Sequence, residues 1–319
     1  MTLSPRRVLI PLVAIALLAT GYILFPWPMP AATSFTLVAH RGVHQTHPGR
    51  DEGVTNETCT AELIDPPRHA YIENTIPSMA AAFAAGADAV ELDIHRTADD
   101  QLIVFHDWTL DCRTNGTGVT NQQTVADLQR LDIGYGYTAD GGRTFPLRGQ
   151  GVGQMPTLPE VLTAFPDQQF IIHDKDGDAE THNILGSYLQ TLPAGQRALL
   201  SYWGGDEIAL IQDHAPEVRP YFVHRNDIQR CLGDYLLRMM VLGSLPERCR
   251  ERILAIPYSR LNTLPGWPHL ILARAHQAGA RVYVVDVDTA EAWAQVQDLP
   301  LDGVQTNRIE DLGPLIRSG

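Results

Sequence analysis

Two carboxylates in this sequence have the spacing of a cation site. Glu91 and Asp93 lie two residues apart in "AVELDIH" (89–95), so both carboxylates project from the same side of an extended strand. Two adjacent carboxylates raise each other's pKa unless a cation lies between them, and their oxygens suit Mg²⁺ or Ca²⁺. A pair of acids on a solvated strand end is the alternative, but the apolar residues that alternate with them favour a buried strand.

Two histidines and two basic residues could complete a phosphate site. His40 and His106 are candidates for proton transfer, because imidazole titrates near neutral pH. Arg41 and Lys175 supply positive charge. A divalent cation combined with these four side chains could hold a phosphate and stabilise charge that develops on it. A single histidine is more often structural, so this prediction requires that the fold brings the residues together.

In the segment "QQFIIHDKDGD" (168–178), the question is to which side of a strand each polar side chain points. Its apolar residues look like a buried strand, and three polar side chains follow, His173, Asp174 and Lys175. If the segment stays extended, His173 and Lys175 lie on one face and Asp174 on the other.

These polar residues stand at the C-terminal ends of short apolar runs that alternate with amphipathic helical patterns. The predicted strands are 35–40, 89–95, 169–175, 197–203, 219–223, 253–259, 281–287 and 302–307. Strands rich in Val, Ile and Leu that alternate with helices indicate a parallel sheet buried on both faces. Eight such units favour an α/β fold of the (β/α)8 TIM-barrel type over residues 35–319, whose C-terminal strand ends meet at one face.

Two long segments interrupt the repeat. Residues 43–72 form a polar insertion, and residues 96–157 contain a small predicted hairpin around "LIVFHD" and a Gly-rich loop. Long loops in a compact domain usually shape a site or are disordered.

The N-terminal 34 residues look like a signal anchor with a Pro-rich linker. Arg6 and Arg7 precede an uncharged run over 8–25, which is short for a membrane span and long for a signal-peptide core. We expect an anchor that leaves the domain outside the cytoplasm, in the cell envelope or periplasm, or a secreted protein if the segment is cleaved.

Export would place four cysteines in an oxidising compartment. Three connectivities are possible, and we favour Cys59 with Cys112 and Cys231 with Cys249. Four free, buried thiols are the alternative.

The charge balance limits the partners. The formal net charge is −13, from 24 Lys plus Arg and 37 Asp plus Glu. Because binding phosphates of nucleic acid requires a basic face, this balance argues against a nucleic-acid partner.

Several of these segments, in order and spacing, resemble the glycerophosphodiester phosphodiesterase family. They are "VAHRG" (38–42), "ENT" (73–75), "GADAVELDIHRTADDQLIVFHDWTL" (86–110), "TNGTG" (114–118), "PTLPEVL" (156–162) and the strand that ends in Lys175. The resemblance implies a TIM barrel, one divalent metal and hydrolysis of glycerophosphodiesters to sn-glycerol 3-phosphate and an alcohol. Mg²⁺ or Ca²⁺ is the expected metal, with Mn²⁺ or another transition metal as alternatives.

The resemblance also assigns roles. His40 and His106 would be the general acid and base, and Arg41 and Lys175 would hold the phosphate. The predicted metal set is Glu91, Asp93, Glu73 and His173, with Glu73 as a ligand or as a partner of the ligands.

One departure concerns the metal. The family's third ligand is usually a Glu two residues before the strand-end Lys, where this chain has His173. Imidazole favours borderline ions over Ca²⁺.

Two other functions stay open: a phospholipase D-like or phosphoinositide-specific phospholipase C-like activity on intact lipids, and an inactive barrel that binds ligands.

Overall fold

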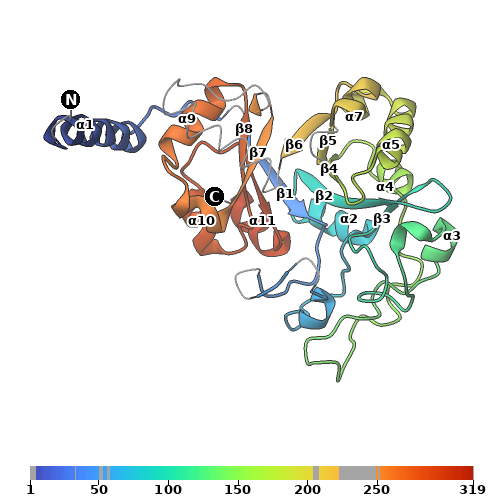
Figure 1. Ribbon diagram of the computed structural model, residues 1–319. Helices are drawn as coiled ribbons and strands as arrows, with labels where there is room; N and C mark the ends of the chain where they lie inside the picture. Colours follow the sequence, from blue (N-terminus) through green and yellow to red (C-terminus); the bar gives the residue numbers. More distant parts are fainter. Residues whose placement is uncertain are drawn as a thin grey trace. The chain divides into compact units, whose positions relative to one another are not determined.

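The computed structural model describes residues 5–32, 34–49, 53–55, 58–203, 208–222, 249–250 and 252–318. From residue 36 onward, strands alternate with helices (Figure 1). The strands are β1 (Thr36–His40), β2 (Ala89–Arg96), β3 (Leu102–Val104), β4 (Gln169–Asp174), β5 (Leu200–Trp203), β6 (Arg219–Phe222), β7 (Ile253–Pro257), β8 (Arg281–Val285) and β9 (Gly303–Thr306). The α-helices are α1 (Pro5–Leu24), α2 (Ile76–Ala84), α3 (Val125–Leu128), α4 (Leu158–Ala164), α5 (Ala179–Thr191), α6 (Ala194–Arg197), α7 (Ile208–His214), α9 (His269–Gln277), α10 (Ala290–Val296) and α11 (Ile309–Ser318). Short 3₁₀ helices are η2 (Thr60–Leu63), η3 (Thr120–Gln122) and η6 (Tyr258–Thr263).

The strands have the connectivity of a (β/α)8 barrel. Their hydrogen-bonded order is β1-β9-β8-β7-β6-β5-β4-β2-β3, and an additional β1–β2 pairing closes this order on itself. The pairs β1–β2, β2–β4, β4–β5, β5–β6, β7–β8 and β8–β9 are parallel, whereas β3 is antiparallel to β2. The predicted barrel, its eight strands and the small hairpin are therefore confirmed.

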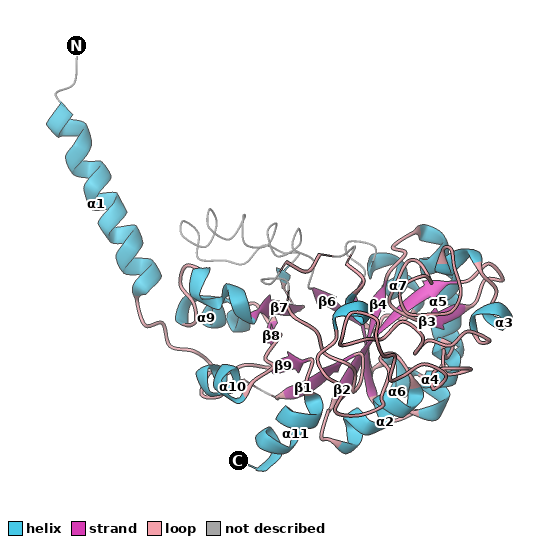
Figure 2. Ribbon diagram, turned by 90° about the horizontal axis from the view of Figure 1, so that it is seen from below, coloured by secondary structure: helices cyan, strands magenta, loops and turns pink. Residues whose placement is uncertain are grey.

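The chain divides into two compact units. The larger unit contains Thr36–Tyr221, Val287–Trp293 and Gln305–Gly319, and the smaller one contains Met1–Phe35, Phe222–Asp286 and Ala294–Val304. In the larger unit, helices such as α2, α4 and α5 lie outside the strands (Figure 2). In the smaller unit, α9 packs against β8. All of the candidate site residues belong to the larger unit.

Thr75 and Gly86 mark the two ends of helix α2. The Thr75 side chain accepts a hydrogen bond from the backbone N–H of Ser78, and Ser78 bonds back to Thr75, a reciprocal cap that satisfies free backbone groups of the first turn. Gly86 follows the last turn with φ +103°, a conformation that glycine adopts at little cost. These two residues therefore determine where the helix after the first strand starts and stops.

The two long insertions pack together. Ile64 and Ile72 of the first insertion join Ile103, Leu128 and Met155 of the second in one buried hydrophobic cluster. The predicted disulfide between Cys59 and Cys112 links the two insertions beside this cluster. The insertions are therefore ordered parts of the domain.

Only one cysteine of the second predicted disulfide lies among the described residues. Cys249 is disulfide-bonded, but its predicted partner, Cys231, lies outside the described residues.

The N-terminal segment departs from the prediction. Within the described ranges, no helix has both the length and the apolar character needed to cross a membrane. The predicted membrane-spanning segment is therefore not supported, although residues 5–24 do form a helix.

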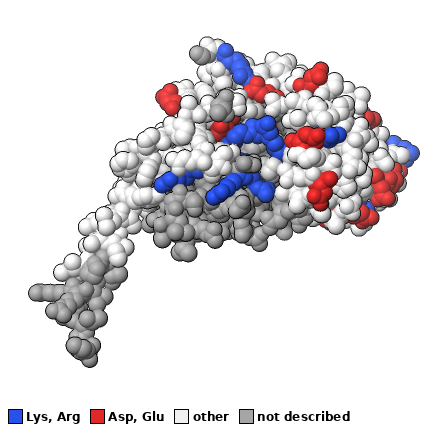
Figure 3. Space-filling view, turned by 90° about the horizontal axis from the view of Figure 1, so that it is seen from above, with Lys and Arg blue, Asp and Glu red and all other residues white. Residues whose placement is uncertain are grey.

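The net charge of −13 does not exclude exposed basic side chains. On the face seen from above in Figure 3, several Lys and Arg side chains (blue) are exposed among the Asp and Glu side chains (red). An acidic chain can thus present basic side chains locally.

Candidate active site

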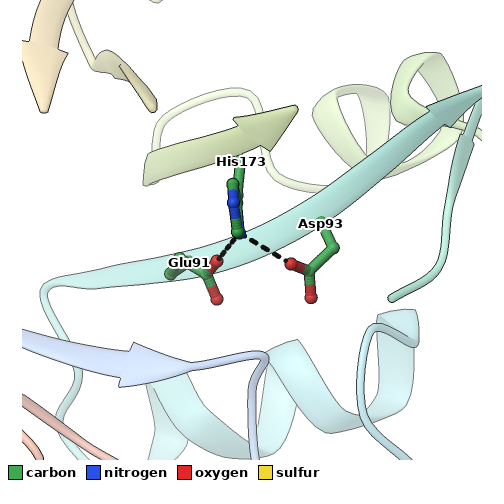
Figure 4. A group of neighbouring side chains, drawn as sticks. All are labelled: Glu91, Asp93 and His173. Atoms are coloured by element: carbon green, nitrogen blue, oxygen red, sulfur yellow. Dashed lines mark ion pairs between the residues drawn. The ribbon is translucent and has the colours of Figure 1, made fainter. Parts of the chain in front are cut away.

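Strand register brings three potential metal ligands together. Asp93 is the Cα partner of His173 in the parallel pair β2–β4, and Glu91 lies on the same side of β2. His173 Nδ1 lies 2.9 Å from Asp93 Oδ1 and 3.4 Å from Glu91 Oε1 (Figure 4). One ligand atom from each residue lies within 4.8 Å of the others. The two-residue spacing of Glu91 and Asp93, together with the pairing of β2 with β4, thus produces a cluster of three potential ligands.

The donor atoms of this cluster fit a divalent metal ion. Glu91 and Asp93 are fully buried, and among the described residues both oxygens of Glu91 and Oδ1 of Asp93 accept no hydrogen bond. Burial would raise the pKa of Asp93, but Arg41 and its other cationic neighbours hold that pKa well below its usual range. A buried, ionised carboxylate with unused lone pairs is what a cation requires.

Arg41 lies directly beside the cluster. Its Nε is 3.1 Å from Asp93 Oδ2 and its Nη1 donates to Glu73 Oε1 at 3.0 Å. The residue immediately follows β1 with φ +58°, and Gly42 continues the turn at φ +82°. A Cβ on Gly42 would lie 2.5 Å from Ser78 Oγ, so only glycine lets the chain turn here against α2.

Lys175 reaches the cluster from β4. Its Nζ lies 3.7 Å from Asp93 Oδ1 and 4.7 Å from the ring centroid of Trp108. Burial lowers the pKa of Lys175, and the Asp93 carboxylate opposes that change. Arg41 and Lys175 therefore place positive charge on two sides of Asp93, where an anionic phosphate could bind.

Glu73 contacts arginines and is not part of the three-residue cluster. Its Oε1 accepts from Arg41, and its Oε2 lies 3.3 Å from Arg113 Nη1 and 3.4 Å from the Tyr137 hydroxyl. Burial would raise the pKa of Glu73, but the two guanidinium groups hold it far below its usual range. This placement favours Glu73 as a partner of the ligands, one of the two roles expected for it.

The tautomer of His40 follows from its partners. Asn307 Nδ2 donates to Asp288 Oδ2 at 2.8 Å, so the other end of this amide, Oδ1, faces His40 Nδ1 at 2.5 Å. Because Oδ1 can only accept, Nδ1 carries the proton. His40 Nε2, 3.6 Å from Glu91 Oε2, faces the cluster, and in the neutral imidazole it is the nitrogen that carries the lone pair.

His106 has a comparable arrangement. Its Nδ1 lies 2.6 Å from Asp107 Oδ1, and Asp107 Oδ2 is 3.0 Å from Arg113 Nε. Burial, together with the charge of Arg41, lowers the pKa of His106 to about 3. The imidazole is therefore neutral at physiological pH, and the contact with the Asp107 carboxylate, which can only accept, places its proton on Nδ1.

Two further histidines, His95 and His44, are buried. His95 is fully buried on β2, with Nδ1 2.9 Å from Asp176 Oδ1 and Nε2 3.4 Å from the carbonyl oxygen of His106. His44 is 5% exposed, and its ring meets that of His40 edge to face. Asp176, 81 residues later in the chain, supplies the buried partner of His95.

Asp174 points away from the cluster, as alternation along β4 predicts. Its Oδ2 accepts a hydrogen bond from the Tyr202 hydroxyl at 3.1 Å and lies 3.1 Å from His182 Nε2. His173 and Asp174 therefore face opposite sides of β4, and only His173 faces the cluster.

Several residues around the site were missed in the sequence. They are Asn74, Asp107, Arg113, Asp288 and Asn307. Asn74 Nδ2 donates to Asp93 Oδ2 at 2.9 Å. Asn307 comes at the end of a predicted strand, as Lys175 does, so the search for polar residues at strand ends could have found it.

Comparison with known proteins identifies the family. The sequence profile described as the glycerophosphoryl diester phosphodiesterase family matches residues 40–311. The chain belongs to this family. A glycerophosphodiester phosphodiesterase of Caldanaerobacter subterraneus subsp. tengcongensis is 37% identical over 101 residues, which are 32% of this chain and 38% of that relative. The match thus spans well under half of that relative's length.

Solved structures share the fold. The glycerophosphoryl diester phosphodiesterase domain of a Mycobacterium tuberculosis protein superposes with a TM-score of 0.64 at 18% identity, over 89% of this chain and 99% of the other. An Oleispira antarctica phosphodiesterase, solved with the product sn-glycerol-3-phosphate, gives a TM-score of 0.59 at 18% identity, over 91% of this chain and 97% of the other.

Proposed function

We propose that this protein hydrolyses glycerophosphodiesters to sn-glycerol 3-phosphate and an alcohol, with one bound divalent metal. The observation that carries the proposal is the cluster of Glu91, Asp93 and His173 with His40 and His106 on the same unit. Family membership supports the reaction class. The Oleispira antarctica phosphodiesterase was solved with sn-glycerol-3-phosphate as its product, and this supports sn-glycerol 3-phosphate as the product proposed here.

Within this proposal the cations bind the substrate. Arg41 and Lys175 flank Asp93 and would hold the phosphate oxygens through charge-assisted hydrogen bonds. Glu91, Asp93 and His173 would hold the metal, which would act as a Lewis acid on phosphate oxygen. Mg²⁺, Ca²⁺ and Mn²⁺ are the ions to test first.

The two histidines would transfer protons. In the first step a neighbouring glycerol hydroxyl attacks phosphorus, one imidazole takes the hydroxyl proton and the other donates a proton to the departing alcohol. Water then opens the cyclic phosphate while the histidines exchange roles. Because the attack is intramolecular, it gains an effective molarity of about 10⁵ M or more. The Nε2 atom of His40 faces the cluster, where it could give or accept a proton, and this supports its role.

A substrate panel tests the proposal. Glycerophosphocholine and glycerophosphoethanolamine should release glycerol 3-phosphate with Mg²⁺, Ca²⁺ or Mn²⁺, and chelation or His40→Ala should abolish the release. A lysophospholipid in the same panel distinguishes action on lipids from action on deacylated diesters. Absence of turnover on all of these diesters with all three metals would exclude the proposed activity.

We further propose that the domain lies outside the cytoplasm, either attached to a membrane or secreted. The disulfide between Cys59 and Cys112 supports export, because such bonds persist in oxidising compartments. Fractionation of cells that express the full chain, followed by thiol labelling, would test this location. Recovery of the protein in the cytosol with reduced cysteines would contradict it.

A further inference from the structure

Three paired strands place a tryptophan in line with the proposed metal cluster. Asp93 on β2 is the Cα partner of His173 on β4, and His173 is the Cα partner of Trp203 on β5. Directly paired residues point to the same side of a sheet, so their side chains are nearest neighbours. The row therefore runs from a carboxylate through the imidazole to the indole.

The imidazole and the indole are stacked face to face. The ring centroids of His173 and Trp203 are 3.6 Å apart and the planes differ by 7°. A histidine binds a metal through a lone pair in the plane of its ring. Stacking covers one face of the imidazole and leaves its nitrogen edge free, so Nδ1 can still be directed at Glu91 and Asp93.

The stack takes the place of a hydrogen bond. In most metal sites the second ring nitrogen of a ligating histidine donates to a carboxylate or carbonyl, which fixes the ring. No such bond to His173 Nε2 is found in the described part of the chain. The indole itself is supported, because Trp203 packs at 6.0 Å against the ring of Tyr221, whose hydroxyl donates to Gln305. The ring face of Trp203 is thus what restrains the imidazole.

We propose that Trp203 is the positioning residue that holds His173 as a metal ligand, and that this nitrogen ligand gives the centre a preference for borderline transition ions over Ca²⁺. The inference rests on the metal centre of the proposed function. Two carboxylates alone suit Ca²⁺ or Mg²⁺, whereas an oriented imidazole adds a ligand that transition ions accept more readily. Loss of the indole would free the imidazole to rotate and weaken that preference.

Calorimetric titration without substrate tests this inference, with Co²⁺ as the transition ion and Ca²⁺ as the oxygen-seeking ion. Trp203→Ala should raise the Kd for Co²⁺ about tenfold to a hundredfold, as expected for residues that orient ligands, and change the Kd for Ca²⁺ less than twofold. Trp203→Phe, which keeps an aromatic face, should stay near the wild type. Equal losses for both ions, or no loss for Co²⁺, would overturn the inference.

Two further variants distinguish positioning from a general effect on folding. In a His173→Gln background, Trp203→Ala should have no additional effect on Co²⁺ binding, because its effect acts through the imidazole; an undiminished effect would contradict the proposal. Trp108→Ala is the matched control, since Trp108 lies near Lys175 and His106 and should leave the ratio of the two Kd values unchanged. Thermal unfolding of each variant checks that it is folded.

These measurements also separate the inference from the proposed function. A protein that binds neither ion would contradict both. A protein that binds Co²⁺ regardless of Trp203 would contradict only the positioning role. A protein that shows the expected selectivity but hydrolyses no diester would contradict only the proposed activity.

Discussion

His40 and Asn307, which are 267 residues apart in the chain, are joined by a 2.5 Å contact between Nδ1 and Oδ1. One residue ends the first barrel strand and the other directly follows the last. Asp288 accepts from both the backbone N–H and the side-chain amide of Asn307, which fixes the direction of the amide. The orientation of a proposed catalytic histidine is therefore set from the far end of the chain.

Replacement of Asn307 should reduce turnover by releasing His40. Asn307→Ala removes the acceptor of Nδ1, so the proton can move to Nε2 and block the lone pair that faces the cluster. We expect kcat to fall about tenfold or more, and by less than the roughly 10²–10⁴-fold expected for His40→Ala. Steady-state kinetics on glycerophosphocholine provides the measurement. If Asn307→Ala retains the wild-type kcat, the asparagine does not position His40.

Lys175 should be required for its charge. Lys175→Ala removes a cation from one side of Asp93, and we expect kcat/KM to fall by about 10²-fold or more, the range for loss of one group that stabilises transition-state charge. Lys175→Arg, which keeps the charge on a different geometry, should recover part of the activity. Full activity of Lys175→Ala would show that the end of β4 does not meet the phosphate.

The barrel and the core of the site could be predicted because both depend on local pattern. Apolar runs give the strands, period-two alternation gives the side on which Glu91, Asp93 and Lys175 lie, and the barrel brings the strand ends to one face. Alternation also placed Asp174 outside the site.

Other features could not be predicted because they depend on partners far away in sequence. His95 continues the alternation of Glu91 and Asp93, yet its burial depends on Asp176. The contact between His40 and Asn307 exists because the last strand pairs next to the first. The stack of Trp203 on His173 depends on the register of β4 with β5. Sequence alone specifies neither register nor closure.

The buried His44 should make the fold sensitive to mild acid. Burial, and also the charges of Arg41 and Arg113, lower the pKa of His44 to about 3, against an ordinary value of 6.5 that applies in the unfolded chain. Between these values the unfolded chain binds a proton that the folded protein does not, so stability decreases as the pH falls below 6.5.

A non-titrating replacement tests this pH dependence. From pH 7.5 to pH 4.5, His44→Gln should lose about 2–3 kcal/mol less of its unfolding free energy than the wild type. Urea unfolding at a series of pH values gives the comparison. Parallel pH profiles for the two proteins would contradict the assignment.

The disulfide between Cys59 and Cys112 should stabilise the fold and hold Arg113, the residue after Cys112, in position. Its half-cystines adjoin Thr60 and Arg113, which are hydrogen-bonded at 2.7 Å. The bond closes a loop with a sequence separation of 53 residues, so Cys59→Ala should cost about 2–4 kcal/mol of unfolding free energy. Arg113 pairs with both Glu73 and Asp107, so kcat should fall as well, even at temperatures where the variant is folded. Equal activity of oxidised, reduced and Cys59→Ala proteins would limit the disulfide to a role in stability.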